Sequence, residues 1–324
     1  LRIKVDGIDT IASCPNHMNP ALSYIDPSAV GEIKVFAGIT PVSVGGDSIG
    51  GTVIASSPAP VFAEPGTGSR AKGEAGAFYR SNGDARGANA TATYLSETLS
   101  LGYAGAFAEA GNYRAGGDFR AGTATGRPGH ALPLHEVGST AYETRNHLLS
   151  IAHRGERHLV EAKFGYQDMP FQLYPNQRMD LLGNTAERAN LRYLGSFGWG
   201  SLEARAYHER VEHFMDFGAD KRFWYAGASG GPSAVDGVEC SPAGPACAAG
   251  MPMYTESRTT GFSAKADVSL GEGSLVRAGG EYQGYRLDDW WPPTGGGMWP
   301  DTFWNVRDGR RDRKALFAEW EGRA

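Results

Sequence analysis

Most of this 324-residue chain alternates apolar and polar residues at period two, and this pattern constrains the fold more than any other feature. The clearest examples are residues 160–167, 190–199 and 262–270. A period of two is that of a β-strand, in which successive side chains point to opposite faces. The sequence therefore predicts long amphipathic strands from about residue 68 onward, with one apolar and one charged or polar face.

The connections between these strands are short and long in turn. Short turns are expected at residues 154–156, 198–201 and 271–273, and long loops near residues 114–140, 168–188, 217–254 and 288–312. This asymmetry is typical of outer-membrane β-barrels, and a soluble sandwich seldom shows it so regularly. No run of 18 or more apolar residues is present, so a transmembrane helix is not expected. We therefore predict an all-β transmembrane antiparallel barrel wall of roughly ten strands.

The first 58 residues have a different pattern. Short strands are expected at residues 1–5, 33–37 and 50–56, separated by turn residues. The order of Ile25-Asp26-Pro27-Ser28-Ala29-Val30, Glu32-Ile33-Lys34-Val35 and Ile49-Gly50-Gly51-Thr52-Val53-Ile54 resembles the C-terminal half of the plug domain of TonB-dependent outer-membrane receptors. This resemblance implies half of an α+β plug at 1–58, a linker at 59–67 and the N-terminal part of the barrel at 68–324.

Barrels wide enough to hold a plug need about 22 strands. The chain is therefore expected to be part of a longer receptor. The resemblance also implies partnership with the TonB energy-transducing complex, through an N-terminal segment that lies outside this sequence, and contact with outer-membrane lipid. A net charge of −5 without basic patches gives no indication of nucleic-acid binding.

The three cysteines divide unevenly. Cys240 and Cys247 bracket a loop rich in Gly and Pro, a spacing that suits a disulfide in an oxidising compartment. This leaves Cys14, which lies four residues before Met18. Thiolate and thioether are soft donors that favour Cu(I), although a buried inert Cys and a packing Met are the alternative interpretation.

A second pair of candidate ligands lies on the strand expected at residues 202–216. His213 and Met215 share its charged face with Glu203, Arg205 and Glu209, and we expect this face to point at the plug. Cys14-x-x-x-Met18 together with His213-x-Met215 resembles the TonB-dependent copper receptors. The segment at residues 175–180, which contains Met179, is similar to that family too.

This second resemblance implies a copper site between plug and barrel. Its expected ligands are Cys14, Met18, Met179 and Met215, with His17 and His213 in supporting or capture roles; Met169 competes with Met179 for the fourth position. The implied function is active import of copper, as Cu(I), across the bacterial outer membrane.

The alternative function is that of a siderophore or other small-ligand receptor of the same fold. In that case the sulfur residues are structural, and aromatic residues of the outer loops bind an organic chelate: Trp290, Trp291, Trp299 and Trp304. The sequence contains no Gly-x-Ser-x-Gly, phosphate-binding loop or His-Glu-x-x-His motif, so we do not expect an enzyme.

Overall fold

The computed structural model describes residues 1–14, 19–45, 48–123, 125, 129–177, 179–221, 224–225, 247–248, 252–293 and 301–322. In this part of the chain a small mixed sheet packs against a large antiparallel sheet. No helix among the described residues is long and apolar enough to cross a membrane.

The small sheet is formed by the N-terminal segment. Its strands, in the spatial order β2-β1-β4-β3, are β1 (Arg2–Val5), β2 (Ile8–Asp9), β3 (Glu32–Phe36) and β4 (Thr52–Ser56). The helical turns η1 (Ala21–Tyr24), η2 (Pro27–Ala29) and α1 (Val42–Gly45) connect them. β1 and β4 are parallel, whereas the other two pairs are antiparallel. The three predicted strands are therefore confirmed; we call this unit the plug.

The large sheet contains ten strands, each hydrogen-bonded to its neighbours in sequence order. They are β5 (Arg70–Arg80), β6 (Ala85–Leu95), β7 (Leu99–Ala110), β8 (Tyr142–Arg154), β9 (His158–Gln172), β10 (Asp180–Phe197), β11 (Gly200–Asp216), β14 (Met253–Ser269), β15 (Ser274–Trp291) and β16 (Phe303–Gly322). The turn η3 (Asn82–Asp84) joins β5 to β6, and β12 (Trp224–Tyr225) pairs with β13 (Cys247–Ala248). The prediction of roughly ten strands is confirmed.

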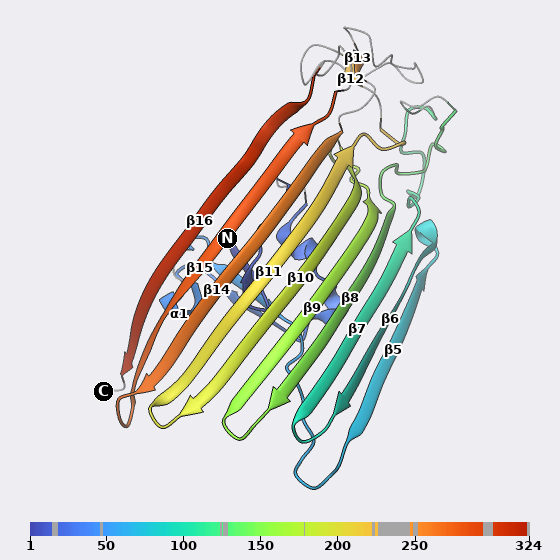
Figure 1. Ribbon diagram of the computed structural model, residues 1–324. Helices are drawn as coiled ribbons and strands as arrows, with labels where there is room; N and C mark the ends of the chain where they lie inside the picture. The colour runs from blue at the N-terminus through green and yellow to red at the C-terminus, as the bar shows by residue number, and fades with distance from the viewer. Residues whose placement is uncertain are drawn as a thin grey trace.

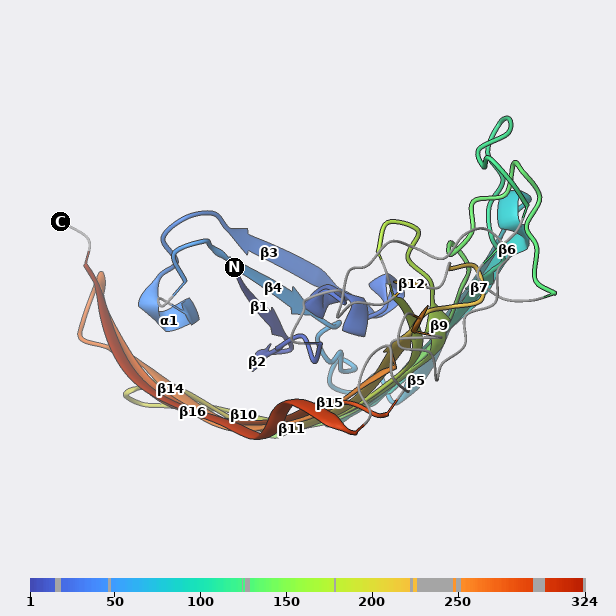
Figure 2. The same cartoon turned by 90° about the horizontal axis from the view of Figure 1, so that it is seen from above.

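The strands run side by side with short turns at one end and the longer loops at the other (Figure 1). Seen from above, the sheet is a curved wall and the plug lies on its concave side (Figure 2). One turn shows why glycine is needed: Gly200 has a φ of 145°, and a Cβ at this position would lie 1.9 Å from the carbonyl oxygen of Asp267. L side chains rarely adopt this conformation.

The two faces of the wall differ as the alternation predicts. Leu149, Phe164 and Phe262 on the convex face are exposed, whereas Lys163 and Glu209 on the concave face are buried beneath the plug. Apolar side chains outside and polar side chains inside are the arrangement of a membrane-spanning barrel. The predicted class, a wall of an antiparallel β-barrel with part of a plug, is confirmed.

Three predicted loops are shorter in the structure. β9 continues to Gln172 and β10 begins at Asp180, so the loop expected at 168–188 is reduced to residues 173–179. β14 likewise begins at Met253, while β15 continues to Trp291 and β16 begins at Phe303. The loop ends of these strands carry polar residues on both faces, so they lack the alternation by which a strand is recognised.

Plug and wall are joined by a cycle of four charges. Arg2 on β1 lies 2.9 Å from both Asp9 of the plug and Glu281 on β15. Arg313 on β16 pairs with the same two carboxylates, at 3.0 Å from Glu281. The four side chains are between 9% and 25% exposed, so they lie mostly out of water. We call them the charge quartet.

Candidate functional site

Cys14 lies at the seam between plug and wall. It is a fully buried thiol. Its neighbour Ser13 makes two hydrogen bonds. The N–H of Ser13 donates to the hydroxyl of Tyr24 at 3.2 Å, and its hydroxyl donates to Ser257 on β14 at 3.1 Å. The second bond crosses from plug to wall. Ser13 is therefore held against the inner face of β14, in the half of the strand that is nearer the long loops, and the buried Cys14 is the next residue.

Two methionines face each other on the wall. Met215 on β11 lies directly opposite Met253 on β14, and both are completely buried. Directly opposite residues of an antiparallel pair have Cβ atoms about 5 Å apart. Two flexible thioethers at that separation can reach one ion. Met253 and Ser257 are on the same face of β14, so Met253 lies on the face to which Ser13, the neighbour of Cys14, is hydrogen-bonded.

His213 lies two residues before Met215 on the same inner face and is 3% exposed. Its Nδ1 is 3.1 Å from the amide oxygen of Asn184 on β10. Since that oxygen only accepts, Nδ1 carries the proton and Nε2 keeps its lone pair. Nε2 has no hydrogen-bond partner among the described residues. A buried imidazole nitrogen of this kind suits a metal ion, with Asn184 fixing the ring.

Met179 reaches the same region from the other side. It is 3% exposed and lies immediately before β10, in which Leu181 is directly opposite Met215. Burial raises the pKa of Tyr174, in the same loop, to about 12, and the nearby Cys14 and Asp180 act in the same direction. Cys14 therefore lies close to the loop that ends at Met179.

Two buried carboxylates hold the loops above this region. Asp180 accepts hydrogen bonds from the backbone N–H of Tyr174 at 2.7 Å and from the hydroxyl of Ser139 at 3.0 Å. Asp220 accepts from the backbone N–H of Ser139 and from Nε2 of His130, each at 2.7 Å. Three loops, at residues 111–141, 173–179 and 217–221, are thereby tied together. We call these five residues the loop cluster.

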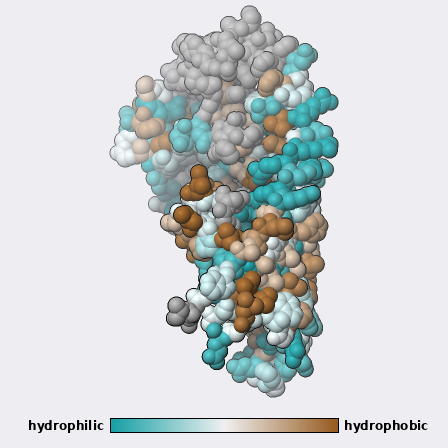
Figure 3. Space-filling model, turned by 90° about the vertical axis from the view of Figure 1, so that its left-hand side faces the viewer, coloured by the Kyte–Doolittle hydropathy of each residue, from teal (hydrophilic) through white to brown (hydrophobic). Residues whose placement is uncertain are grey.

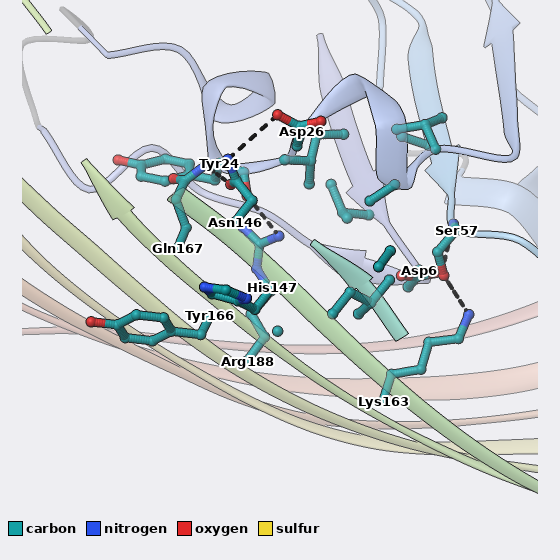
Figure 4. Close-up of a pocket in the computed structure, with 18 of the residues that line it drawn as sticks. Asp6, Tyr24, Asp26, Ser57, Asn146, His147, Lys163, Tyr166, Gln167 and Arg188 are labelled. Atoms are coloured by element: carbon teal, nitrogen blue, oxygen red, sulfur yellow. Dashed lines mark hydrogen bonds and ion pairs between the residues drawn. The ribbon is translucent and has the colours of Figure 1, made fainter. Parts of the chain in front are cut away.

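A small cavity of about 80 Å³ lies farther along the seam, between the plug and β7 to β10 (Figure 4). Lys163 on β9 donates to Asp6 at 3.1 Å and to Ser57 at 2.6 Å, both in the plug. On the other side of the cavity, Gln167 donates to Asn146 at 2.8 Å. Side chains that already satisfy one another leave few donors for a ligand, so this cavity is part of the plug–wall contact.

Several predicted residues fall outside the described part of the chain. They are His17, Met18, Trp299 and Cys240, and only the backbone of Cys247 is described. Three of the four expected sulfur ligands, Cys14, Met179 and Met215, are described; all three are buried, and His213 is buried on the same strand as Met215. In the described part no group of three His, Cys, Asp or Glu side chains is arranged to hold a metal.

Met253 was not among the predicted ligands. Residues 217–254 were expected to be a loop, so the pairing of Met253 with Met215 had no sequence signal; only a register prediction for β11 and β14 would have found it. The tryptophans of the alternative function divide between the two faces. Trp290 and Trp304 are neighbours on the convex face, with tilted rings whose centres are 5.5 Å apart, whereas Trp291 is buried on the concave face.

Comparisons with known proteins support the fold. No family model and no curated protein matches the sequence. The solved structure of the copper transporter OprC has a TM-score of 0.70 at 18% identity, covering 90% of this chain and 39% of OprC. The FrpB iron transporter from Neisseria meningitidis (F3-3 variant) has a TM-score of 0.59 at 19% identity, covering 88% of this chain and 41% of FrpB.

The siderophore receptor PirA from Pseudomonas aeruginosa has a TM-score of 0.58 at 14% identity, covering 98% of this chain and 44% of PirA. This chain thus spans less than half the length of each of these three proteins. Their names describe transport or reception of copper, iron or siderophores, and none describes an enzyme. At such identities the likeness establishes the fold alone: part of a β-barrel wall with a plug domain on its inner side.

Proposed function

We propose that this chain is part of an outer-membrane receptor that binds copper where the plug meets the barrel and imports it with TonB-supplied energy. The observation that carries the proposal is the position of Cys14. This buried thiol of the plug follows Ser13, which is hydrogen-bonded to Ser257 on the inner face of β14, and the same face presents Met253 directly opposite Met215. Soft donors buried together from two structural units form an environment suited to Cu(I).

The proposed ligand set is Cys14, Met18, Met179 and Met215. We add His213 as a direct ligand, whereas the sequence suggested only a supporting or capture role, because its Nε2 is buried without a hydrogen-bond partner among the described residues. Met253 is added because its register places it beside Met215. His17 keeps its proposed supporting role. Copper is the transported substrate here, bound as Cu(I) by thiolate and thioether groups.

The position of the ligands suggests how copper is released. Cys14 and Met18 belong to the plug, whereas Met179 and Met215 belong to the wall or its loops. Any displacement of the plug therefore separates the ligand set and lowers its affinity for the ion. The loop cluster closes the outer side of the site, so we expect the ion to leave toward the short-turn end of the barrel.

The alternative, a siderophore or other small-ligand receptor of the same fold, has support from the similarity to the siderophore receptor PirA and the iron transporter FrpB. Thermal unfolding of the full-length receptor separates the two functions. Cu(I), or Ag(I) as a redox-inert soft mimic, should stabilise the copper receptor by about 2.7 kcal/mol at a hundredfold excess over the dissociation constant. Stabilisation by a ferric siderophore, with no response to either soft ion, would establish the alternative.

A further inference from the structure

Four arginines lie side by side on the convex face of the wall. Arg210 on β11 is directly opposite Arg258 on β14, which is opposite Arg286 on β15, which is opposite Arg310 on β16. Adjacent strands are about 4.8 Å apart, so the row is about 14 Å long. We call it the arginine row. It faces away from the plug and from the proposed copper site.

Such a row is unfavourable unless something compensates for it, because like charges directly opposite each other destabilise a sheet. Each arginine forms an ion pair with one carboxylate, in the pairs Arg210–Glu212, Arg258–Glu256, Arg286–Asp312 and Arg310–Asp308, and Glu187 on β10 also lies directly opposite Arg210. The arginine side chains are 41% to 64% exposed, and exposed pairs of this kind contribute little. A guanidinium has five N–H donors, so each arginine keeps donors for a further anion.

An apolar groove of about 1140 Å³ lies on the same face, closer to the short turns. Small residues form its floor, and larger apolar or aromatic side chains surround it: Ala204, Ala206, Ala264 and Gly280, then Leu191, Tyr193, Phe262, Tyr282 and Leu316. On β11 the groove begins four residues from Arg210, about 13 Å along the strand. Figure 3 shows the edge of this face, with hydrophilic side chains gathered in its upper part and more hydrophobic ones below.

An aromatic row lies on the other side of the arginines. The aromatic rings of four residues adjoin in order across the same four strands, with centres 4.5 to 5.5 Å apart: Phe214, Tyr254, Trp290 and Trp304. Aromatic girdles mark the level at which the lipid headgroups of a membrane meet the apolar band of a barrel. The arginine row therefore lies at or just inside that level, within reach of lipid headgroups.

We propose that the arginine row and the groove bind a phosphorylated glycolipid of the outer leaflet, with phosphates on the arginines and an acyl chain in the groove. The proposal rests on the outer-membrane location in the proposed function, but not on copper. Arginine binds phosphate through two parallel hydrogen bonds. A row of about 14 Å exceeds the reach of one phosphate and suits a headgroup with two. The row lies toward the long loops, which face the outside.

The acidic partners restrict how the phosphates approach. Glu212, Glu256, Asp288 and Asp308 lie between the arginine row and the aromatic row, while Asp312 lies on the groove side. Phosphates should therefore approach the arginines mainly from the groove side, near β11 and β14. This is the direction from which a headgroup arrives when its acyl chain occupies the groove.

Native mass spectrometry of the detergent-solubilised full-length receptor tests the proposal, with bisphosphorylated lipid A, monophosphorylated lipid A and phosphatidylglycerol as probes. We expect the affinity to be highest for bisphosphorylated lipid A, lower for monophosphorylated lipid A and lowest for phosphatidylglycerol. In the Arg258→Gln/Arg286→Gln variant, binding of the bisphosphorylated lipid should fall at least tenfold. Arg145→Gln is the matched control, because Arg145 is an exposed, ion-paired arginine of the same face without an arginine opposite.

The groove gives a second variant that keeps every charge. Ala264→Phe fills the floor and should also weaken lipid A binding, so it decides the question if the arginine variant fails to fold. Equal lipid A binding by the wild type and a folded variant of either kind would overturn the proposal, as would phosphatidylglycerol binding as tightly as lipid A. Stabilisation by Ag(I) should persist in both variants, so failure of the lipid site is distinguishable from failure of the copper site.

Discussion

The charge quartet should hold the plug against the wall, and Asp9→Asn tests how strongly. Asp9 pairs with both Arg2 of the plug and Arg313 of β16, and its side chain is 10% exposed. Removing its charge leaves two mostly buried guanidinium groups with Glu281 as their remaining quartet carboxylate. The plug should then open locally more often, while the wall keeps its strand pairing.

The size of the effect follows from the geometry. Removing one partner of a fully buried pair costs about 3 to 5 kcal/mol. Glu281 still pairs with both arginines, and Glu281 and Arg313 are 22% and 25% exposed, so water screens part of the loss. We therefore expect roughly half of that cost, about 1.5 to 2.5 kcal/mol, or a ten- to hundredfold gain in local opening.

Hydrogen exchange in the full-length receptor measures this opening at the backbone amides of β1 and β2. Asp9→Asn should speed their exchange by the expected factor and leave β9 and β10 unchanged. Glu212→Gln removes an exposed carboxylate of the convex face and should change plug exchange less than twofold. Unchanged exchange in Asp9→Asn would refute the view that the quartet holds the plug.

The same contact has a pH dependence. Burial alone would raise the pKa of Asp9, but the hydrogen bond and charge of Arg2, with Arg313, outweigh it and hold the pKa below its ordinary value. A lowered folded-state pKa means that the stabilisation is complete above the unfolded-state pKa and is lost as pH falls through the folded-state pKa. Plug exchange in the wild type should therefore accelerate below about pH 4, with less acceleration in Asp9→Asn.

Two further predictions concern the loops and the sulfur set. Asp220→Asn should weaken the loop cluster and speed proteolysis within residues 111–141 severalfold, because one charged acceptor of three hydrogen bonds is lost; unchanged cleavage would contradict this. Met179→Leu and Met253→Leu should each lower the affinity for Ag(I) roughly tenfold, measured by competition with a chelator. Met169→Leu is the control, because Met169 is as large as Met179 and similarly buried, and it should leave the affinity for Ag(I) unchanged. If Met169→Leu lowered the affinity as much as Met179→Leu, the assignment of Met179 rather than Met169 as the ligand would be wrong.

The class of fold was predictable because period-two alternation reports which face of a strand meets lipid. Residues 190–199 show this well, with Leu191 and Tyr193 on the convex face as expected. The loop ends of the strands were not predictable, since β10 from Asp180 to Glu187 mixes apolar and polar residues without a period of two. Alternation ends where the lipid ends, although the hydrogen-bonded ladder continues.

The candidate site was partly predictable for a similar reason. His213 and Met215 could be assigned to the inner face by parity within one strand. Met253 could not, because its position depends on the register between β11 and β14, which no local pattern encodes. The arginine row was missed for the same reason: its four members are scattered along the chain, and only strand pairing aligns them.

The copper content of the purified full-length receptor tests the central claim most directly. Elemental analysis after removal of loosely bound metal should give close to one copper per wild-type molecule and almost none in Cys14→Ala, with an intermediate loss in Met215→Leu. Thiolate is the strongest soft donor of the set, so its removal should have the largest effect. Equal copper content in wild type and Cys14→Ala would contradict a site shared between plug and barrel.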